Sequence, residues 1–123
     1  MKRLILVRHA KSSLNQPLVS DHERILNESG KNEAKLIGQY LSNNQHIPSH
    51  IISSTAARTL ETANIIIDQI KFKDKIDTQS LIYSESFLDI LNLINNIDNQ
   101  YQCVMLVGHN PTINQLINHI TNV

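Results

Sequence analysis

The sequence predicts an α/β fold in three layers, α/β/α, with helices on both faces of a mainly parallel sheet. Short apolar runs, such as 4–7 and 104–107, lack the alternation of polar and apolar residues and are typical of strands covered on both faces. Between these runs lie longer segments whose apolar residues recur every three or four positions, as on one face of a helix. Strands that alternate with helices favour a parallel sheet.

The elements follow one another in a simple order, and no linker or internal repeat divides them. With 123 residues, the chain is long enough for one domain, 1–123, with a single core. In chain order we expect a strand at 3–8, a loop at 15–24, a helix at 28–43, a strand at 50–52, a helix at 56–70, a weak strand at 76–82, a helix at 86–97, a strand at 102–107 and a final helix to about 120.

Local signals support the helices in this order. Asn27 is a suitable N-cap for the first helix. An apolar stripe on that helix is expected from Ala34, Leu36, Ile37, Tyr40 and Leu41. The helix at 56–70 repeats Ala56, Leu60, Ala63, Ile67 and Ile70 at helical spacing, and the one at 86–97 carries Leu88, Leu91 and Ile94. Asn110 as N-cap and Pro111 at the first helical position predict the start of the final helix.

Composition excludes several classes of function. The formal net charge is zero and no run of Lys or Arg exceeds two residues, which argues against binding to nucleic acid or to an acidic membrane. The first residues contain only four consecutive apolar positions, too few for a signal peptide, so a cytoplasmic protein is expected. Cys103 is the single cysteine and is expected to be buried and inert. No two histidines lie four apart on a predicted helix, so neither a metal nor another cofactor is expected.

Cationic side chains follow the predicted strands at the same edge of the sheet. Arg8 and His9 end the first strand, His109 ends the last, and Arg58 lies three or four residues into the helix after the second. Ligands of parallel sheets bind beyond the carboxyl ends of the strands. Two imidazoles and two guanidiniums in that position predict an anion pocket, and phosphate matches the forked donors of arginine.

The arrangement resembles the histidine phosphatase superfamily, with its phosphoglycerate mutase-like fold. The matching segments are "LVRHA", "SSTAARTLETA" and "LVGHNP", in the order of that family. More narrowly, "LVRHAKSS", "DHERILNESG" and "VGHNP" are similar to the compact branch that includes bacterial phosphohistidine phosphatases. The resemblance extends over nearly the whole chain.

The resemblance implies a role for each of the four residues. His9 would be the nucleophile that forms a phosphohistidine intermediate, Arg8 and Arg58 would clamp the nonbridging oxygens, and His109 would donate to another oxygen. Lesser candidates for substrate binding are Asn15, Arg24, Ser12 and Lys11. A surface role is an equal or stronger alternative for each of these.

The sequence also departs from the family. Asn110 stands where one branch has an acidic aspartate, and Glu85 is a weakly supported candidate for the acid that another branch uses. Thr55 replaces the usual proline after the second strand. Relatives usually continue beyond the helix at which this chain ends, so a shortened C-terminal end and an exposed sheet edge are expected, in a monomer or a weak homodimer.

A missing acid favours one reaction over another. An alkoxide leaving group needs a proton, whereas the imidazole of a phosphohistidine leaves readily once protonated by solvent. We therefore expect a phosphohistidine phosphatase that acts on a phosphorylated protein, such as a phosphotransfer domain in signalling. The alternatives are a small-molecule phosphomonoesterase of the same fold, and a catalytically silent module that binds phosphate or a phosphoprotein. A mutase ranks lower, and a structural domain without a pocket stays a further possibility.

Overall fold

Four parallel strands form the sheet of the computed structural model, which describes residues 1–84 and 86–122. Their order is β1 (Arg3–Arg8), β4 (Cys103–Gly108), β2 (His50–Ser53) and β3 (Asp77–Thr78). In the register, Arg8 pairs with Gly108 and Ser53 pairs with Val107, so β1, β4 and β2 end side by side. The predicted parallel α/β sheet is confirmed.

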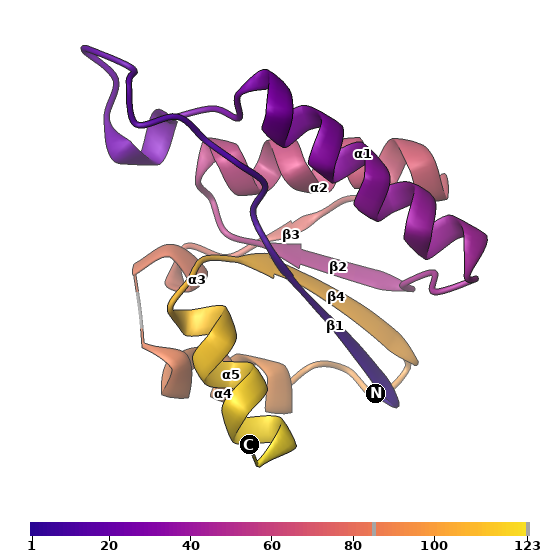
Figure 1. Ribbon diagram of the computed structural model, residues 1–123. Helices are drawn as coiled ribbons and strands as arrows, with labels where there is room; N and C mark the ends of the chain where they lie inside the picture. The colour runs from indigo at the N-terminus through magenta and orange to yellow at the C-terminus, as the bar shows by residue number, and fades with distance from the viewer. Residues whose placement is uncertain (85, 123) are drawn as a thin grey trace.

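Helices cover both faces of this sheet (Figure 1). On one face lie α1 (Glu28–Asn43) and α2 (Ala57–Ile70), and on the other lie α4 (Phe87–Asn95) and α5 (Thr112–Thr121). Two short elements, the 3-10 helix η1 (Asp21–Glu23) and α3 (Leu81–Ser84), lie near the carboxyl ends of the strands. The three predicted layers are therefore present. Among the described residues, no helix combines the length and apolar character needed to cross a membrane.

The pleat of β4 divides the core into two clusters. Met105 and Val107 pack toward α1 and α2, whereas Val104 and Leu106 pack toward α4 and α5. All six residues of β4 are buried, which explains its unbroken apolar sequence. Each fully buried aliphatic side chain contributes about 1.5–3 kcal/mol to folding. The strand β4 is therefore firmly held, and so is the residue that follows it at its carboxyl end.

The strand β1 differs from the prediction of a strand buried on both faces. It is an edge strand, and only Val7 among its residues is buried. The predicted strand at 76–82 is also shorter, since β3 has two residues and residues 81–84 are helical. The sequence pattern did not distinguish the edge strand β1 from the central strand β4, because both contain an unbroken apolar run.

The helix α1 has the predicted bounds and the predicted cap. The side chain of Asn27 accepts a hydrogen bond of 2.7 Å from the backbone N–H of Gly30. The predicted stripe is wrong at Leu36 and Tyr40, which are 65% and 60% exposed. Small residues at the α1–α2 contact allow the close approach instead: a Cβ on Gly38 would lie 2.7 Å from the Cβ of Gln69.

The last two helices begin and end slightly differently from the prediction. Phe87 begins α4, which ends at Asn95 and leaves Leu88 exposed. Thr112 begins α5 with Pro111 as its N-cap residue, so Pro111 is not the first helical residue. Asn110 is not the N-cap either, but its Oδ1 accepts a 3.1 Å hydrogen bond from the N–H of Asn114.

Candidate active site

Two histidines lie side by side because they follow neighbouring strands. His9 comes directly after β1 and His109 directly after β4, and the two strands pair in register up to Arg8 and Gly108. The backbone N–H of His9 donates to the carbonyl of Gly108 over 3.0 Å. The ring centroids of His9 and His109 are 5.3 Å apart, close enough for both rings to contact one small anion.

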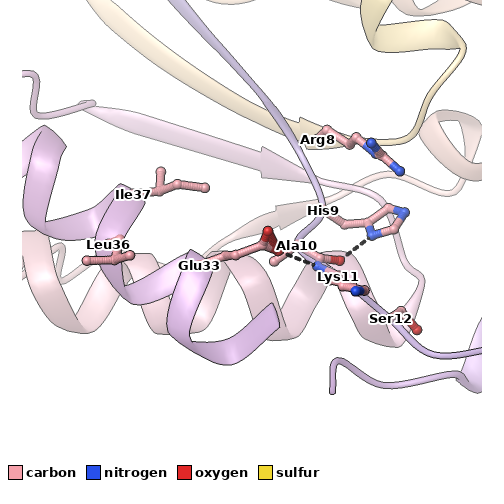
Figure 2. Close-up of a pocket in the computed structure, with 8 residues that line it drawn as sticks. All are labelled: Arg8, His9, Ala10, Lys11, Ser12, Glu33, Leu36 and Ile37. Carbon is pink, nitrogen blue, oxygen red and sulfur yellow. Dashed lines mark hydrogen bonds between the residues drawn. The ribbon is translucent and has the colours of Figure 1, made fainter. Parts of the chain in front are cut away.

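The ring of His9 is oriented by its own backbone. Its Nδ1 lies 2.7 Å from the carbonyl oxygen of Ala10 (Figure 2). A carbonyl oxygen only accepts, so Nδ1 carries the hydrogen and Nε2 keeps a free electron pair. Burial lowers the pKa of His9 below its ordinary value of 6.5, Arg58 and Arg8 lower it further, and the Ala10 hydrogen bond opposes them. His9 is therefore neutral at physiological pH, with an unprotonated Nε2.

The ring of His109 contacts a buried serine at the end of β2. Its Nε2 is 2.8 Å from the Oγ of Ser54. Burial first, and then the charge of Arg58, lower the pKa of His109 from 6.5 to about 4. His109 is therefore neutral near pH 7 and carries a single ring hydrogen.

Arg58 lies at the start of α2, as its second residue, closer to the helix start than predicted. Its side chain is buried, and its guanidinium donates from Nη1 to the carbonyl oxygen of Asp21 over 2.6 Å and from Nη2 to Asp21 Oδ2 over 3.1 Å. One turn later, Thr62 Oγ1 donates to the Arg58 carbonyl and accepts from the N–H of Ala10. The α2 helix thus holds the segment after His9.

The carboxylate of Asp21 collects donors from three directions. Besides Arg58, it accepts from Arg24 Nε at 3.2 Å and Nη2 at 3.0 Å, and from the hydroxyl of Tyr83 at 2.8 Å. The Tyr83 hydrogen bond, followed by the hydrogen bonds from both arginines, holds the pKa of Asp21 well below its usual range, although burial acts in the opposite direction. The same hydrogen bond raises the pKa of Tyr83. Asp21 is therefore ionised at any physiological pH.

These groups surround one open cavity of about 490 Å³. Its lining residues are His9, Asp21, Arg24, Arg58, Tyr83, His109 and Asn110. Three of the four residues predicted to carry the chemistry meet there. The fourth, Arg8, lies at the end of β1 and is exposed.

A second pocket of about 710 Å³ lies between the end of β1 and α1 (Figure 2). Arg8 and His9 border it together with Lys11 and Ser12, and α1 contributes Glu33, Leu36 and Ile37 to its far wall. In Figure 2 the side chains of Arg8 and His9 both extend away from α1. His9 thus borders both spaces, whereas Arg58 and His109 border only the first.

The lesser candidates separate into different places. Arg24 lines the cavity and donates from Nη1 to Ser12 Oγ over 2.9 Å, so Ser12 supports Arg24 rather than lining the cavity. Asn15 is exposed, and its N–H donates to Ser13 Oγ within its own loop. Glu85 lies outside the described residues. Among those that are described, no group of three His, Cys, Asp or Glu side chains is arranged to hold a metal ion.

Three residues of the site were not singled out from the sequence: Asp21, Tyr83 and Ser54. Asp21 precedes Arg24 by three positions in "DHER", a spacing that suits an ion pair, and this was the available signal. Tyr83 lies in α3, a helix that the sequence did not predict. Ser54 follows the predicted strand at 50–52 with no sequence signal of its own, yet its side chain is fully buried beside His109.

The match to a protein-family model decides the family. The model described as "Histidine phosphatase superfamily (branch 1)" matches residues 4–81, more than half of the chain. The chain belongs to the histidine phosphatase superfamily. The resemblance drawn from the sequence motifs is thereby confirmed.

Solved structures agree with this family, and those most relevant here are described as SixA proteins. A crystal structure of a protein of Agrobacterium tumefaciens, proposed to be the phosphohistidine phosphatase SixA, superposes with a TM-score of 0.91 at 33% identity, covering 98% of this chain and 77% of that one. The structure of the protein histidine phosphatase SixA complexed with tungstate shares the fold, with a TM-score of 0.85 at 17% identity, covering 94% of this chain and 74% of that one.

Four curated relatives that match this chain are described as uncharacterized proteins. A chloroplastic protein of Arabidopsis thaliana is 32% identical over 121 residues, which cover 89% of this chain. That alignment covers 54% of the relative, so this chain spans about half of its length. The family is thus established, and the substrate is a separate question.

Proposed function

We propose that this chain is a phosphohistidine phosphatase that hydrolyses a phosphorylated histidine on a protein, such as a phosphotransfer domain, through a covalent intermediate at His9. The observation that carries the proposal is the state of Asp21. Of the described residues, Asp21 is the one carboxylate that lines the cavity of His9 and His109, and it is held ionised. The 33% identical SixA-like structure supports the same substrate class.

An ionised carboxylate favours P–N cleavage over P–O cleavage. An alkyl phosphate leaves as an alkoxide and requires a proton from an acid in the transition state. Asp21 cannot supply that proton because its hydrogen bonds keep it deprotonated. The imidazole of a phosphohistidine leaves readily when its second ring nitrogen is protonated, and in this form the phosphorylated ring is cationic. A nearby negative charge stabilises that cation.

The chemical steps need no further acid. The electron pair of His9 Nε2 forms a bond to phosphorus, and the substrate P–N bond breaks, returning its electron pair to the substrate imidazole. That imidazole leaves neutral because its other nitrogen keeps its hydrogen. The His9 ring, with Nδ1–H held by Ala10, is now the cationic leaving group. Water attacks phosphorus, the bond to Nε2 breaks, and both hydrogens of the water leave with the phosphate.

Donors around the cavity would stabilise the charge that spreads over the phosphoryl oxygens. Arg58 and Arg24 supply guanidinium hydrogens, and His109 supplies a neutral imidazole hydrogen. Arg8 lies at the border of the second pocket and would contact the anion from the side of β1. Because the donors are held before substrate arrives, little reorganisation is needed during the reaction.

A substrate panel tests the proposal. The rate constants kcat/KM are measured in parallel for a histidine-phosphorylated phosphotransfer domain, for p-nitrophenyl phosphate and for glycerate and sugar phosphates. We expect clear preference for the phosphorylated domain, and loss of all turnover in His9→Ala. The matched control is His119→Ala, since His119 lies exposed on α5. A preference for the sugar or glycerate phosphates would overturn the proposal.

The variant Asp21→Asn isolates the reason for the preference. Removing the charge should lower kcat/KM for the phosphohistidine substrate about tenfold more than for p-nitrophenyl phosphate, a difference of about 1.4 kcal/mol. Any general disturbance of Arg58 acts on both substrates and cancels in the ratio. An unchanged ratio would show that Asp21 only positions the arginines.

A further inference from the structure

We propose that Ser54 is a positioning residue that fixes which nitrogen of His109 carries the hydrogen. In this assignment the Ser54 hydroxyl donates to His109 Nε2, and His109 Nδ1–H becomes the donor available to a phosphoryl oxygen. The tautomer itself stands on hydrogen-bond geometry alone, and its use in the reaction rests on the proposed function.

The partners of Ser54 decide the direction of the hydrogen bond. Its Oγ accepts from the backbone N–H of Ala56 over 3.2 Å and lies 2.8 Å from His109 Nε2. These are the two partners of this hydroxyl in the described part of the chain, and the side chain is fully buried. The Ala56 N–H can only donate, so the hydroxyl hydrogen has one acceptor within reach, which is His109 Nε2.

The opposite tautomer leaves more groups unsatisfied. If His109 Nε2 carried the hydrogen, it would donate to Ser54, and the buried hydroxyl hydrogen would have no acceptor. A buried donor without an acceptor costs about 1–3 kcal/mol. With Ser54 as the donor, every hydrogen-bonding group of Ser54 is satisfied. Hydrogen-bond satisfaction therefore selects the tautomer with Nδ1–H.

The remaining unsatisfied atom has a functional explanation. His109 Nδ1 is buried and has no hydrogen-bond partner among the described residues. Since His109 lines the cavity beside His9 and Arg58, a phosphoryl oxygen bound there would accept from Nδ1–H. A buried polar group without a partner is uncommon in native proteins and is frequent at catalytic sites. Neutral His109 has only one ring hydrogen, so its position determines whether the donor faces substrate.

The strand β2 offers a matched control one residue away. Ser53 is also fully buried, and its hydroxyl donates to the carbonyl of Ser54 over 2.9 Å without contacting His109. The variants Ser53→Ala and Ser54→Ala therefore remove the same atom from adjacent buried positions. Ser54→Thr keeps the hydroxyl and tests rescue.

The test combines nitrogen NMR with ligand binding. Two-bond ¹H–¹⁵N spectra at pH 7, with His109 assigned from the spectrum of His109→Gln, should show a protonated Nδ1 and an unprotonated Nε2 in the unmodified protein. Ser54→Ala should lose this preference and bind vanadate roughly tenfold to a hundredfold more weakly, the range of one hydrogen bond to a charged group. Ser53→Ala should change neither, and Ser54→Thr should keep the tautomer.

A protonated Nε2 in the unmodified protein would overturn the inference, even if no Ser54 variant folds. Unchanged tautomer and vanadate affinity in folded Ser54→Ala would also overturn it. The proposed function fails separately: a Ser54-dependent Nδ1–H tautomer without turnover of phosphohistidine would refute the enzyme activity and leave the positioning of His109 intact.

Discussion

The Asp21 carboxylate and the Arg58 guanidinium are in direct contact, with Asp21 Oδ2 3.1 Å from Arg58 Nη2, and both line the cavity beside His9. Each terminal nitrogen of a guanidinium carries two hydrogens. Arg58 uses one hydrogen of Nη1 and one of Nη2 on Asp21 and keeps the second of each. Asp21 therefore orients Arg58 without exhausting its donors.

Replacing Arg58 should reduce catalysis more than it reduces folding. We expect Arg58→Ala to lower kcat/KM for the phosphohistidine substrate by about a hundredfold to a thousandfold, the usual loss for one preorganised donor. Arg58→Lys should recover only part of this, because an ammonium lacks the planar fork. Steady-state kinetics on the folded variants measure both effects.

Arg3 provides the control for that experiment. Its guanidinium contacts His46 at the amino end of β1, away from the cavity. Arg3→Ala removes the same charge from the protein and should leave kcat/KM within about twofold. If Arg58→Ala behaved like Arg3→Ala, the clamp assigned to Arg58 would be wrong.

Phosphoryl transfer to His9 predicts a covalent adduct. Substrate labelled with ³²P, mixed with enzyme and quenched into alkali within milliseconds, should leave label on the protein that is lost on acid treatment. His9→Ala should carry no label. Of the two histidines that line the cavity in the described part of the chain, His9 is the one whose Nδ1 is bonded to a carbonyl oxygen, which leaves Nε2 unprotonated. His119→Ala should be labelled like the unmodified protein. Undiminished label on His9→Ala would refute His9 as the nucleophile.

The sequence predicted the ends of the strands better than it predicted the surroundings of the site. His9 and His109 follow apolar runs whose ends are unambiguous, so their meeting at one sheet edge followed from parallel pairing. Asp21 and Tyr83 could not be placed in this way. They are separated by 62 positions and come from the short helices η1 and α3, and their contact depends on how both lie over the strand ends. No periodicity encodes that contact.

Exposure on α1 could not be predicted either, for a related reason. Leu36 and Tyr40 have the spacing of a buried stripe, yet they are exposed. The buried residues of α1 are Ala34, Leu41 and two glycines. Gly38 lets α2 approach closely, whereas Gly30 lies against the backbone of Lys11. Hydrophobicity alone does not show that backbone contact between two helices will take priority over burial of the larger side chains.

Stability should decrease as pH falls from 7 to 5. The pKa of His109 is about 4 in the folded protein and about 6.5 in the unfolded chain, so between these values the unfolded state binds more protons. Lowering pH within this range therefore favours unfolding, whereas above 6.5 the effect disappears. His9, whose pKa is also lowered, acts in the same direction. The slope is at most about 1.4 kcal/mol per pH unit for each proton, and less for a partly exposed ring.

Urea denaturation at pH 7, 6 and 5 measures this slope. His109→Gln should show a shallower loss of the free energy of unfolding than the unmodified protein, because it lacks one of the groups that bind a proton on unfolding. Asp21 does not confound the comparison. Its contribution to the free energy of unfolding is lost only at more acidic pH, below its ordinary pKa of 3.8. Parallel slopes for both proteins would show that His109 is not desolvated as described.

Two glycines of α1 allow an effect on the backbone after His9 to be distinguished from a general loss of stability. A Cβ on Gly30 would lie 2.0 Å from the carbonyl oxygen of Lys11, so the backbone two residues after His9 must move in Gly30→Ala. A Cβ on Gly38 would meet only the side chain of Gln69 and the backbone of Ile66, far from His9 along α1 and α2. Overpacking of this kind costs about 1–3 kcal/mol, more than the gain of about 1 kcal/mol in helix propensity.

Both variants should therefore lose stability, Gly30→Ala the more because its clash is with backbone, and they should differ in the activity of the folded fraction. Gly38→Ala should keep the kcat of the folded fraction, because the contacts of His9 with Ala10 and Gly108 are untouched. Gly30→Ala should lower kcat by at least tenfold, since a displacement of about 1 Å at the reacting atoms costs on the order of a hundredfold. Thermal unfolding and kinetics on the same samples distinguish the two effects. Equal kcat for both variants would mean that the contact between α1 and Lys11 does not position His9.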